Sequence, residues 1–504
     1  MTPEAHKSVP FRGLVTISIM LATIMQVLDT TIANVALPHM QGSLSASQNQ
    51  IAWVLTSYII ASAIMTLPVG WLSGHYGRKK VFAVSVTGFI IGSMLCGAAT
   101  SIEQMVFFRI LQGISGAALI PLSQSTLLDI NPREKYGQAM ALWGMGVMIG
   151  PILGPTLGGW LTEYYNWRWV FYINLPIGLL ALAGVILFMP ESERKDRKFD
   201  AFGFIMLSLL IGSFQLMIDR GQELDWFNST EILLYCALIG ASLWMYLVHT
   251  LQTDNPFLSQ ELFRDRNFVT SLFFIFLVGI ILLASLALLP PYMQNLMGYP
   301  VIETGVIMAP RGVGVMLAMM ITGRLTGKTD PRILILFGLG MITLSLYEMT
   351  TFALFVPKQT LIWTGVIQGV GLGFTFMPLS TLAYTTLDPK FRDEAAGLFS
   401  LVRNIGSSVG ISMVMVLLTR NIRINHAYLT EYITDTRLGI PWQQVPQSIQ
   451  DNLAMIPALV DGEITRQAAA IAYINDFKFM MWIVIATLPL LLFLKAPPKR
   501  PPAA

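Results

Sequence analysis

The chain has 504 residues, of which 54% are hydrophobic and only 12% are charged. Soluble domains carry about 25% charged residues, and a hydrophobic core of this size would be divided among several domains in water. The deficit of charge extends along the whole chain, which excludes a soluble enzyme with one membrane anchor. The formal net charge of +3 is too small to indicate a nucleic-acid-binding protein.

Neither the cysteines nor the N-terminus indicates a secreted protein. Cys96 and Cys236 both lie in apolar runs, so we expect no disulfide framework. The first apolar run, Gly13 to Leu37, is too long for the hydrophobic part of a signal peptide and has no small-residue cleavage site after it. We interpret it as a retained first membrane span.

Fourteen apolar runs are long enough to cross a bilayer, which takes roughly 20 residues of helix. They start near Gly13, Ile51, Val81, Met105, Ala139, Val170, Ala201, Glu231, Asn267, Glu303, Ile333, Leu361, Ala395 and Phe479. The sequence therefore predicts an all-α polytopic membrane protein. An even number of spans places both termini on the same side of the membrane.

The lysines and arginines indicate which side that is, because short cytoplasmic loops collect them. With the N-terminus inside, the inside segments hold 21 of the 32 basic residues. The short outside loops hold only Arg168, Arg220 and Lys358, and the long segment after span 13 holds five more. We expect a multi-pass protein of the bacterial inner (plasma) membrane with both termini in the cytoplasm.

Two parts of the sequence resemble each other. LQGISGAALIPLSQSTLLDINPRE from Leu111 matches IQGVGLGFTFMPLSTLAYTTLDPK from Ile367, and GWLSGHYGRK from Gly70 matches GRLTGKTDPR from Gly323. Glycine- and proline-rich helices can resemble each other by composition, but two matches in the same order favour a repeat. We therefore expect a six-helix bundle at 1–190, two inserted helices at 191–260 and a second six-helix bundle at 261–504, which includes an extracytoplasmic loop at 421–476.

Span 1 contains an acidic residue, Asp29, in the segment MQVLDTTIANVALP. A charged side chain at the centre of a membrane helix costs about 2.5–3.5 kcal/mol, so it normally faces a cavity or a partner. Burial disfavours the ionised form of a carboxyl group, which lets it exchange a proton near neutral pH. We predict that Asp29 couples transport to protons. The alternative is a structural aspartate bonded to Thr30, Asn34 or a neighbouring helix.

Span 4 contains Arg109 in the segment FFRILQG. A guanidinium is effectively always charged, so Arg109 cannot carry the proton, but it can respond to an emptied carboxylate or polarise a water. Its repeat counterpart falls near Gly365, so this arginine belongs to the first half alone. The alternative is an arginine that reaches back to the membrane surface. Nearby side chains of these two motifs are predicted to line a substrate cavity: Met25, Gln26, Asn34 and Gln112.

Span 5 contains the segment GVMIGPILGPTLGG, in which small residues recur every four positions. Such residues let helix backbones approach closely, and prolines kink a helix. The pattern predicts a close and deformable seam, with ordinary tight packing as the simpler interpretation. The residues concerned are Gly146, Gly150, Pro151, Gly154, Pro155, Gly158 and Gly159.

The remaining charged residues carry less information. Arg78, Lys79 and Lys80 are first of all topology determinants, with gating as a second interpretation. We assign no role to Arg311, Glu348 and Arg403, which also fall within spans. The sequence contains no metal, nucleotide-phosphate or nucleophile motif, and its five histidines are widely separated. We therefore expect neither an enzyme nor a cofactor.

Together these motifs resemble the major facilitator superfamily and, more narrowly, the EmrB-like branch of the fourteen-span drug:proton antiporters (the EmrB/QacA family). WRWVFYINLPIG from Trp167 and DRGQELDWF from Asp219 are also similar to that branch. The resemblance covers nearly the whole chain. It extends to the loop after span 2, through the residues Gly70, Gly77, Arg78 and Lys79. One departure is Gly74, where the family pattern usually has an aspartate, which puts a gating role of this loop in doubt.

The resemblance implies two six-helix bundles around a central cavity and alternating access driven by the proton gradient. It also implies export of hydrophobic or amphipathic drugs, together with a periplasmic adaptor protein and an outer-membrane channel. An exporter of one endogenous metabolite or lipid-like molecule is the alternative. The sequence alone does not separate these two functions.

Overall fold

The computed structural model describes residues 11–132, 135–192, 194, 198–253, 255–326, 328–431 and 455–494. Within these ranges the chain is helical apart from its connections, and a single β-bridge joins Thr326 to Thr329. Thirteen helical segments are long and apolar enough to cross a membrane, and one bent pair of helices counts as a fourteenth. The predicted all-α membrane fold is therefore confirmed.

The first six spans form what we call the N-terminal half. They consist of α1 (Arg12–Ser43), α2 (Gln48–Thr66), α3 (Val69–Tyr76), α4 (Arg78–Ala98), α5 (Ile102–Gly116), α6 (Leu119–Asp129), α7 (Tyr136–Tyr164), α8 (Trp169–Tyr172) and α9 (Asn174–Phe188). The bent pair is α2 and α3, which meet at 54°. Pro68 lies at this bend, where its lack of an N–H group interrupts the helical hydrogen bonds.

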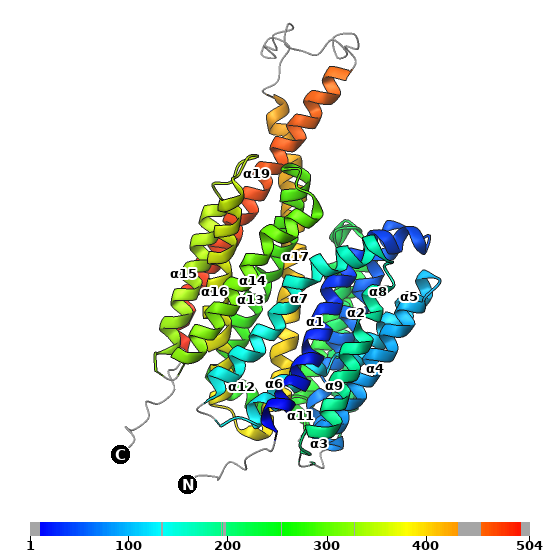
Figure 1. The fold of residues 1–504 in the computed structure, drawn as a ribbon, viewed down its shortest axis with the longest axis vertical. Helices are drawn as coiled ribbons and strands as arrows, with labels where there is room; N and C mark the ends of the chain where they lie inside the picture. The colour runs from blue at the N-terminus through cyan, green and yellow to red at the C-terminus, as the bar shows by residue number, and fades with distance from the viewer. Residues whose placement is uncertain are drawn as a thin grey trace.

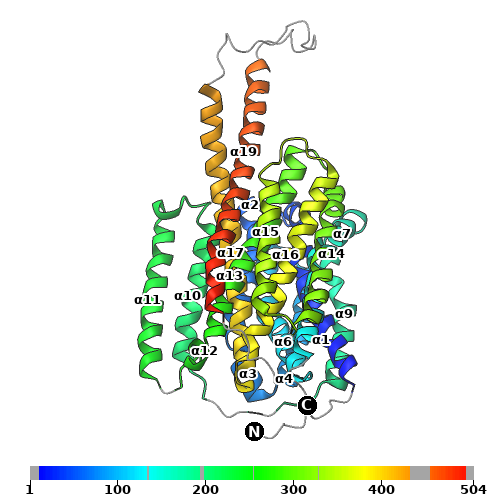
Figure 2. The same ribbon diagram turned by 90° about the vertical axis from the view of Figure 1, so that its left-hand side faces the viewer.

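Two inserted spans stand beside the main bundle (Figure 2). They are α10 (Ala201–Arg220) and α11 (Thr230–Gln252). The short element η2 (Trp226–Asn228) follows α10, and α12 (Gln260–Arg264) follows α11. Asp200 caps α10 by accepting a hydrogen bond of 2.9 Å from the Gly203 N–H. Helix α10 packs against α2 on one side and α17 on the other. It therefore touches both halves of the molecule.

The last six spans form the C-terminal half. They consist of α13 (Arg266–Pro291), its π-helical continuation η3 (Tyr292–Leu296), α14 (Val301–Leu325), α15 (Pro331–Met349), α16 (Lys358–Thr385), η4 (Pro389–Phe391), α17 (Arg392–Glu431), α19 (Met455–Thr487) and η6 (Leu488–Phe493). Figure 1 shows α1, α4, α5 and α9 on one side of the molecule and α13 to α16 and α19 on the other, with α7 and α17 between them.

Helices α17 and α19 extend well beyond the other spans as a projecting pair (Figures 1 and 2). His426 of α17 contacts Asp461 of α19 at 2.9 Å in this projection. The segment 421–476, which we expected to be a loop, is thus helical at both ends, and residues 432–454 lie outside the described ranges. Helix α19 begins at Met455, well before Phe479, where the last span was expected to start.

Candidate functional site

Asp29 of α1 and Arg109 of α5 form an ion pair in the interior of the N-terminal half. Arg109 Nη1 donates to Asp29 Oδ2 at 2.8 Å, and both side chains are completely buried. The two residues are 80 positions apart in the sequence, and the packing of α1 with the other helices of the half brings them together. Each charge is thereby compensated in a region where an isolated charge would be strongly disfavoured.

Two neutral amides complete the surroundings of Asp29. Gln112 Nε2 donates to Asp29 Oδ1 at 2.9 Å, and Asn174 Nδ2 donates to the same oxygen at 2.7 Å. Asn174 also donates to Ser93 Oγ at 2.8 Å. The carboxylate therefore accepts three hydrogen bonds, all from side chains. Sequence reasoning missed the role of Asn174, although the only signal for it, an asparagine in an apolar run, lay in the segment from Trp167.

The guanidinium of Arg109 is held from several directions. Its Nε donates to the Val54 carbonyl at 3.0 Å, and Nη1 also donates to Gln112 Oε1 at 2.7 Å. The Tyr58 ring lies 4.2 Å from the guanidinium carbon, a distance suited to a cation–π contact. Nη2 has no hydrogen-bond partner among the described residues. Arg109 is therefore not an anchor at the membrane surface, which was the alternative interpretation.

The C-terminal half contains a related but uncharged arrangement. Gln368, which the repeat pairs with Gln112, donates to Ser285 of α13 at 3.0 Å, as Gln112 donates to Asp29 of α1. The repeat counterpart of Arg109 falls near Gly365, and a Cβ at Gly365 would lie 3.5 Å from the Cβ of Arg311 on α14. Within the described residues, a carboxylate–arginine pair of this kind is found in the N-terminal half alone.

The four residues predicted to line a substrate cavity do not gather at one point. Gln112 belongs to the Asp29 network, Met25 and Gln26 are buried, and Asn34 is exposed. Asn34 lies further along α1 and is not among the hydrogen-bond partners of Asp29 in the described chain. A cavity lined by these residues stays a prediction.

The glycines of α7 allow two close helix contacts. A Cβ added at Gly146, Gly150, Gly154 or Gly158 would lie between 1.9 and 3.2 Å from an α1 side chain. Thr31 of α1 donates to the Gly150 carbonyl at 3.1 Å across this contact. On its other face α7 packs along α14 of the C-terminal half. Helix α7 therefore forms part of the seam between the halves, while a Cβ at Gly159 would meet nothing within 4 Å.

A second group of charges joins the halves at the end of the molecule where α1 begins and α17 starts. We call Arg78, Asp129, Arg392 and Asp393 the Arg78 cluster. Arg78 pairs with Asp129 at 2.5 Å and with Asp393 at 2.8 Å, and Arg392 also pairs with Asp129. Ser73 of α3 donates to Asp393 at 2.7 Å. Arg392 and Asp393 come from the first turn of α17, so the cluster ties that helix to α3, α4 and α6.

The motif residues after span 2 have distinct positions around this cluster. Gly77 has a φ of 90°, which favours glycine. A Cβ at Gly70 would lie 2.9 Å from the Glu394 Cα, so α3 and α17 touch at their backbones. Lys79 follows Arg78 in the first turn of α4. Gly74 carries no carboxylate, and Asp393 of the other half provides one to Arg78 instead.

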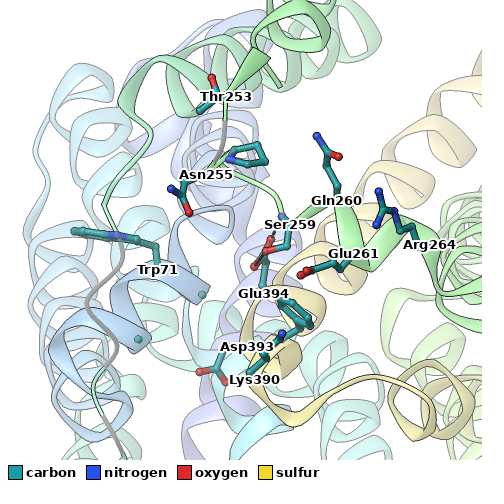
Figure 3. Close-up of a pocket in the computed structure, with 14 residues that line it drawn as sticks. Trp71, Thr253, Asn255, Ser259, Gln260, Glu261, Arg264, Lys390, Asp393 and Glu394 are labelled. Carbon is teal, nitrogen blue, oxygen red and sulfur yellow. Dashed lines mark hydrogen bonds between the residues drawn. The ribbon is translucent and has the colours of Figure 1, made fainter. Parts of the chain in front are cut away.

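Beside the cluster lies a cavity of about 500 Å³ (Figure 3). Trp71 and Gly74 of α3, the connection from α11 to α12, and Asp393 and Glu394 of α17 line it. Figure 3 shows Ser259 beside Glu394, and the Ser259 hydroxyl donates to that carboxylate at 2.9 Å. The inserted spans are thus tied to the start of α17 by a hydrogen bond.

The described residues thus combine thirteen or fourteen helices able to cross a membrane with a compensated charge pair in the interior, which is typical of a multi-pass membrane transporter. The sequence model of the Major Facilitator Superfamily matches residues 19–411. The chain therefore belongs to the major facilitator superfamily and is a transporter of the inner membrane, not an enzyme.

Individual relatives agree with this assignment. The chain is 36% identical over 491 residues to the multidrug export protein EmrB of Escherichia coli (strain K12), covering 96% of this chain and 95% of that protein. It is 34% identical over 488 residues to the fatty acid resistance protein FarB of Neisseria gonorrhoeae, covering 96% of each. These relatives confirm the resemblance to EmrB-like exporters.

A solved structure agrees on the fold. The MFS proton:xylose symporter XylE, bound to 6-bromo-6-deoxy-D-glucose, matches with a TM-score of 0.60 and 13% identity, covering 96% of this chain and 97% of that one. At this level of identity the likeness concerns the fold alone.

Proposed function

We propose that the protein is a proton-driven antiporter that exports hydrophobic or amphipathic drugs by alternating access. The observation that supports this most is the buried pair of Asp29 and Arg109. A carboxylate in such a position can bind and release a proton, while the arginine keeps its charge. The full-length similarity to a multidrug export protein supports the choice of substrates.

The geometry supports a definite role for each group in the coupling step. When a proton neutralises Asp29, Arg109 loses its counter-charge but keeps hydrogen bonds to the Val54 carbonyl and to Gln112. The pair is then weakened, and α1 and α5 are freer to move relative to each other. Gln112 and Asn174 donate hydrogen bonds to the ionised carboxylate and hold it in position.

We further propose that the Arg78 cluster lies at the cytoplasmic side and closes it in this conformation. The positive-inside rule supports this placement, because the loops at that end carry the basic residues. Both termini are then cytoplasmic, and the projecting pair lies outside. Labelling of cysteines placed at Lys198 and Leu459 tests the orientation. Position 198 should react from the cytoplasm and position 459 from outside, and the reverse pattern would contradict it.

Reconstitution of the purified protein with a pH gradient tests the coupling. The Asp29→Asn variant should insert into the membrane normally but lose drug-dependent proton movement, because an amide cannot bind and release a proton near neutral pH. One charge moved through the membrane corresponds to about 2.3 kcal/mol per 100 mV. For each 100 mV, this free energy supports a ratio of about 40-fold between the substrate concentrations on the two sides of the membrane. Full proton-coupled exchange by the Asn variant would refute the assignment of Asp29.

A second candidate function is export of one endogenous metabolite or lipid-like molecule. The similarity to the fatty acid resistance protein FarB favours it. A resistance and accumulation screen in a pump-deficient host, with and without a protonophore, separates the two. Broad resistance supports multidrug export, and protection against a single class of compound supports the second candidate.

We also propose that the pump works with a periplasmic adaptor protein and an outer-membrane channel. The projecting pair of α17 and α19 supports this partner. It presents Ile424 and Leu459, whose exposed fractions are 53% and 49%. A lid that packs over the outer mouth of the pump is the alternative role for this segment.

A further inference from the structure

Two arginines lie inside the C-terminal half without an acidic partner. Arg311 of α14 is 6% exposed, and Arg403 of α17 is half-buried. Neither forms an ion pair in the described part of the chain. By contrast, the buried Arg109 and Arg392 each pair with an aspartate. Arg311 and Arg403 therefore bring uncompensated positive charge into the membrane interior.

Both arginines lie deep in the membrane. Arg403 is eleven residues from Arg392, where α17 starts, or about 16 Å along the helix. This is about half the thickness of the ~30 Å hydrocarbon core. Arg311 is near the middle of α14. An arginine side chain cannot reach the headgroups from this depth, so neither charge is solvated at the membrane surface.

Helix α13 connects the two positions. Arg311 Nη2 makes a long contact of 3.4 Å with the Leu282 carbonyl, and a Cβ at Gly279, one turn away, would lie 2.4 Å from the Arg403 carbonyl oxygen. The two arginines therefore pack on the same stretch of α13. In an interior of low dielectric constant the positive potentials of neighbouring charges add.

Arg403 points into the protein and not into lipid. Phe399 and Ser407, one turn before and one turn after it on the same face of α17, are both buried. The ring of Phe399 lies 5.9 Å from that of Tyr384 on α16, and the Tyr384 hydroxyl donates to Gln124 of α6 at 3.1 Å. Arg403 thus lies close to where the two halves meet, which is where transporters of repeated architecture bind their substrates.

Polar groups of both arginines are left without partners. Arg311 Nη1 is buried and has no hydrogen-bond partner among the described residues. The Arg403 guanidinium makes no hydrogen bond there and keeps accessible surface. Most buried polar side-chain atoms have a hydrogen-bond partner, so these groups can still bind an acceptor. A carboxylate or sulfonate can accept two parallel hydrogen bonds from one guanidinium.

We propose that the transport site selects amphipathic anions, with Arg403 binding the anionic group and Arg311 adding to the positive potential. The inference rests on the proposed export function, since it names the substrate class of that same pump. The N-terminal half then supplies the proton-binding carboxylate, and the C-terminal half supplies the charge that recognises the substrate. An apolar body attached to a carboxylate or sulfonate is the class of molecule that fits.

Two dyes that share one aromatic body test the proposal. Anilinonaphthalene sulfonate carries a sulfonate, and phenylnaphthylamine is the same molecule without it. The full-length protein is reconstituted, and movement of each dye driven by a pH gradient is measured. Arg403→Gln removes a charge-assisted hydrogen bond and with it part of the binding free energy of the sulfonate. This variant should therefore lower the preference for the sulfonate roughly ten- to a hundredfold. Arg403→Lys should retain part of it.

Arg423→Gln is the matched control, because Arg423 is exposed on the projecting part of the same helix. An unchanged ratio between the dyes in Arg403→Gln would overturn the proposal. If Arg403→Gln does not fold, the ratio between the dyes is compared instead between Arg311→Gln and the wild-type protein. A wild-type protein that shows no preference for the sulfonate also overturns the proposal. If neither dye moves with the pH gradient, the export function fails, and titration of both dyes against the purified variants still decides anion recognition.

Discussion

Arg78 and Asp393 form an ion pair of 2.8 Å that joins the start of α4 to the first turn of α17. The related loop pattern usually has an aspartate at the position of Gly74, within the same half as Arg78. Here Arg78 pairs with Asp129 of its own half and also with Asp393 of the opposite half, so the contacts that hold Arg78 also hold the two halves together. Any movement that separates α17 from α3 and α4 must break this pair.

Asp393→Asn should therefore favour opening at this end. The pair is only partly screened, with side chains 12% and 17% exposed, and loss of a charged hydrogen bond costs about 1.5–3 kcal/mol. We expect faster labelling of a cysteine at Ser380, which is buried one turn from Tyr384 at the seam, in a background without Cys96 and Cys236.

Gly74→Asp provides a rescue of that variant. Gly74 lines the same cavity as Asp393, so a carboxylate at position 74 would face the space that Asp393 faces. The double variant Gly74→Asp with Asp393→Asn should label at a rate closer to the wild type. Equal labelling of the wild type and Asp393→Asn would show that the pair does not hold this end closed.

A second prediction concerns the stability of the pair of Asp29 and Arg109. Arg109→Ala leaves a buried carboxylate without its counter-charge, which costs about 3–5 kcal/mol. Asp29→Asn combined with Arg109→Gln removes both charges and should recover most of the thermal unfolding temperature. It should not recover proton-coupled exchange. A double variant as unstable as Arg109→Ala would mean that the charges are not what stabilises this region.

Arg109→Lys completes this series, since a point charge replaces the planar fork only in part. We expect partial exchange from it. Arg168, in the connection from α7 to α8, would not be a suitable control for this series. It donates to the carbonyls of Gly97 at 2.8 Å and Ala99 at 2.6 Å, and so caps the end of α4. Arg423→Gln is the better control, because Arg423 is exposed.

The sequence predicted the spans well because the bilayer requires long apolar runs, and it singled out Asp29 and Arg109 because charges are costly there. It could not show that these two residues pair, since the contact depends on how α1 and α5 each pack against α2 and the other helices of the half. Asn174 escaped notice because a neutral amide costs much less in a membrane than a charge. The early start of α19 was missed because its first turns lie beyond the other spans and are not constrained to be apolar.

The glycines of α7 provide a prediction with a control in the same motif. Gly154→Ala would place a Cβ 2.2 Å from Thr31 Oγ1, whereas Gly159→Ala meets nothing within 4 Å. Overpacking of this kind typically costs about 1–3 kcal/mol. We expect Gly154→Ala to lower both the unfolding temperature and the exchange rate, and Gly159→Ala to match the wild type. Similar losses in both would indicate that the helix, and not its contact with α1, is sensitive.

The projecting pair of α17 and α19 provides the last prediction. Ile424→Ser with Leu459→Ser removes two exposed apolar side chains from the described part of the pair. If a partner protein docks there, resistance of whole cells should fall severalfold, while exchange in reconstituted vesicles stays near the wild-type rate. Arg423→Gln, a polar change on the same surface, should leave both unchanged.

Shortening residues 440–460, most of which lie outside the described ranges, is the stronger version of this experiment. The reason for expecting separate effects is physical: vesicles contain the pump alone, so a docking surface contributes nothing to exchange there. A lid over the outer mouth, in contrast, takes part in every transport cycle. Exchange in vesicles that falls as far as resistance in cells would therefore assign the projecting pair to the cycle and refute docking.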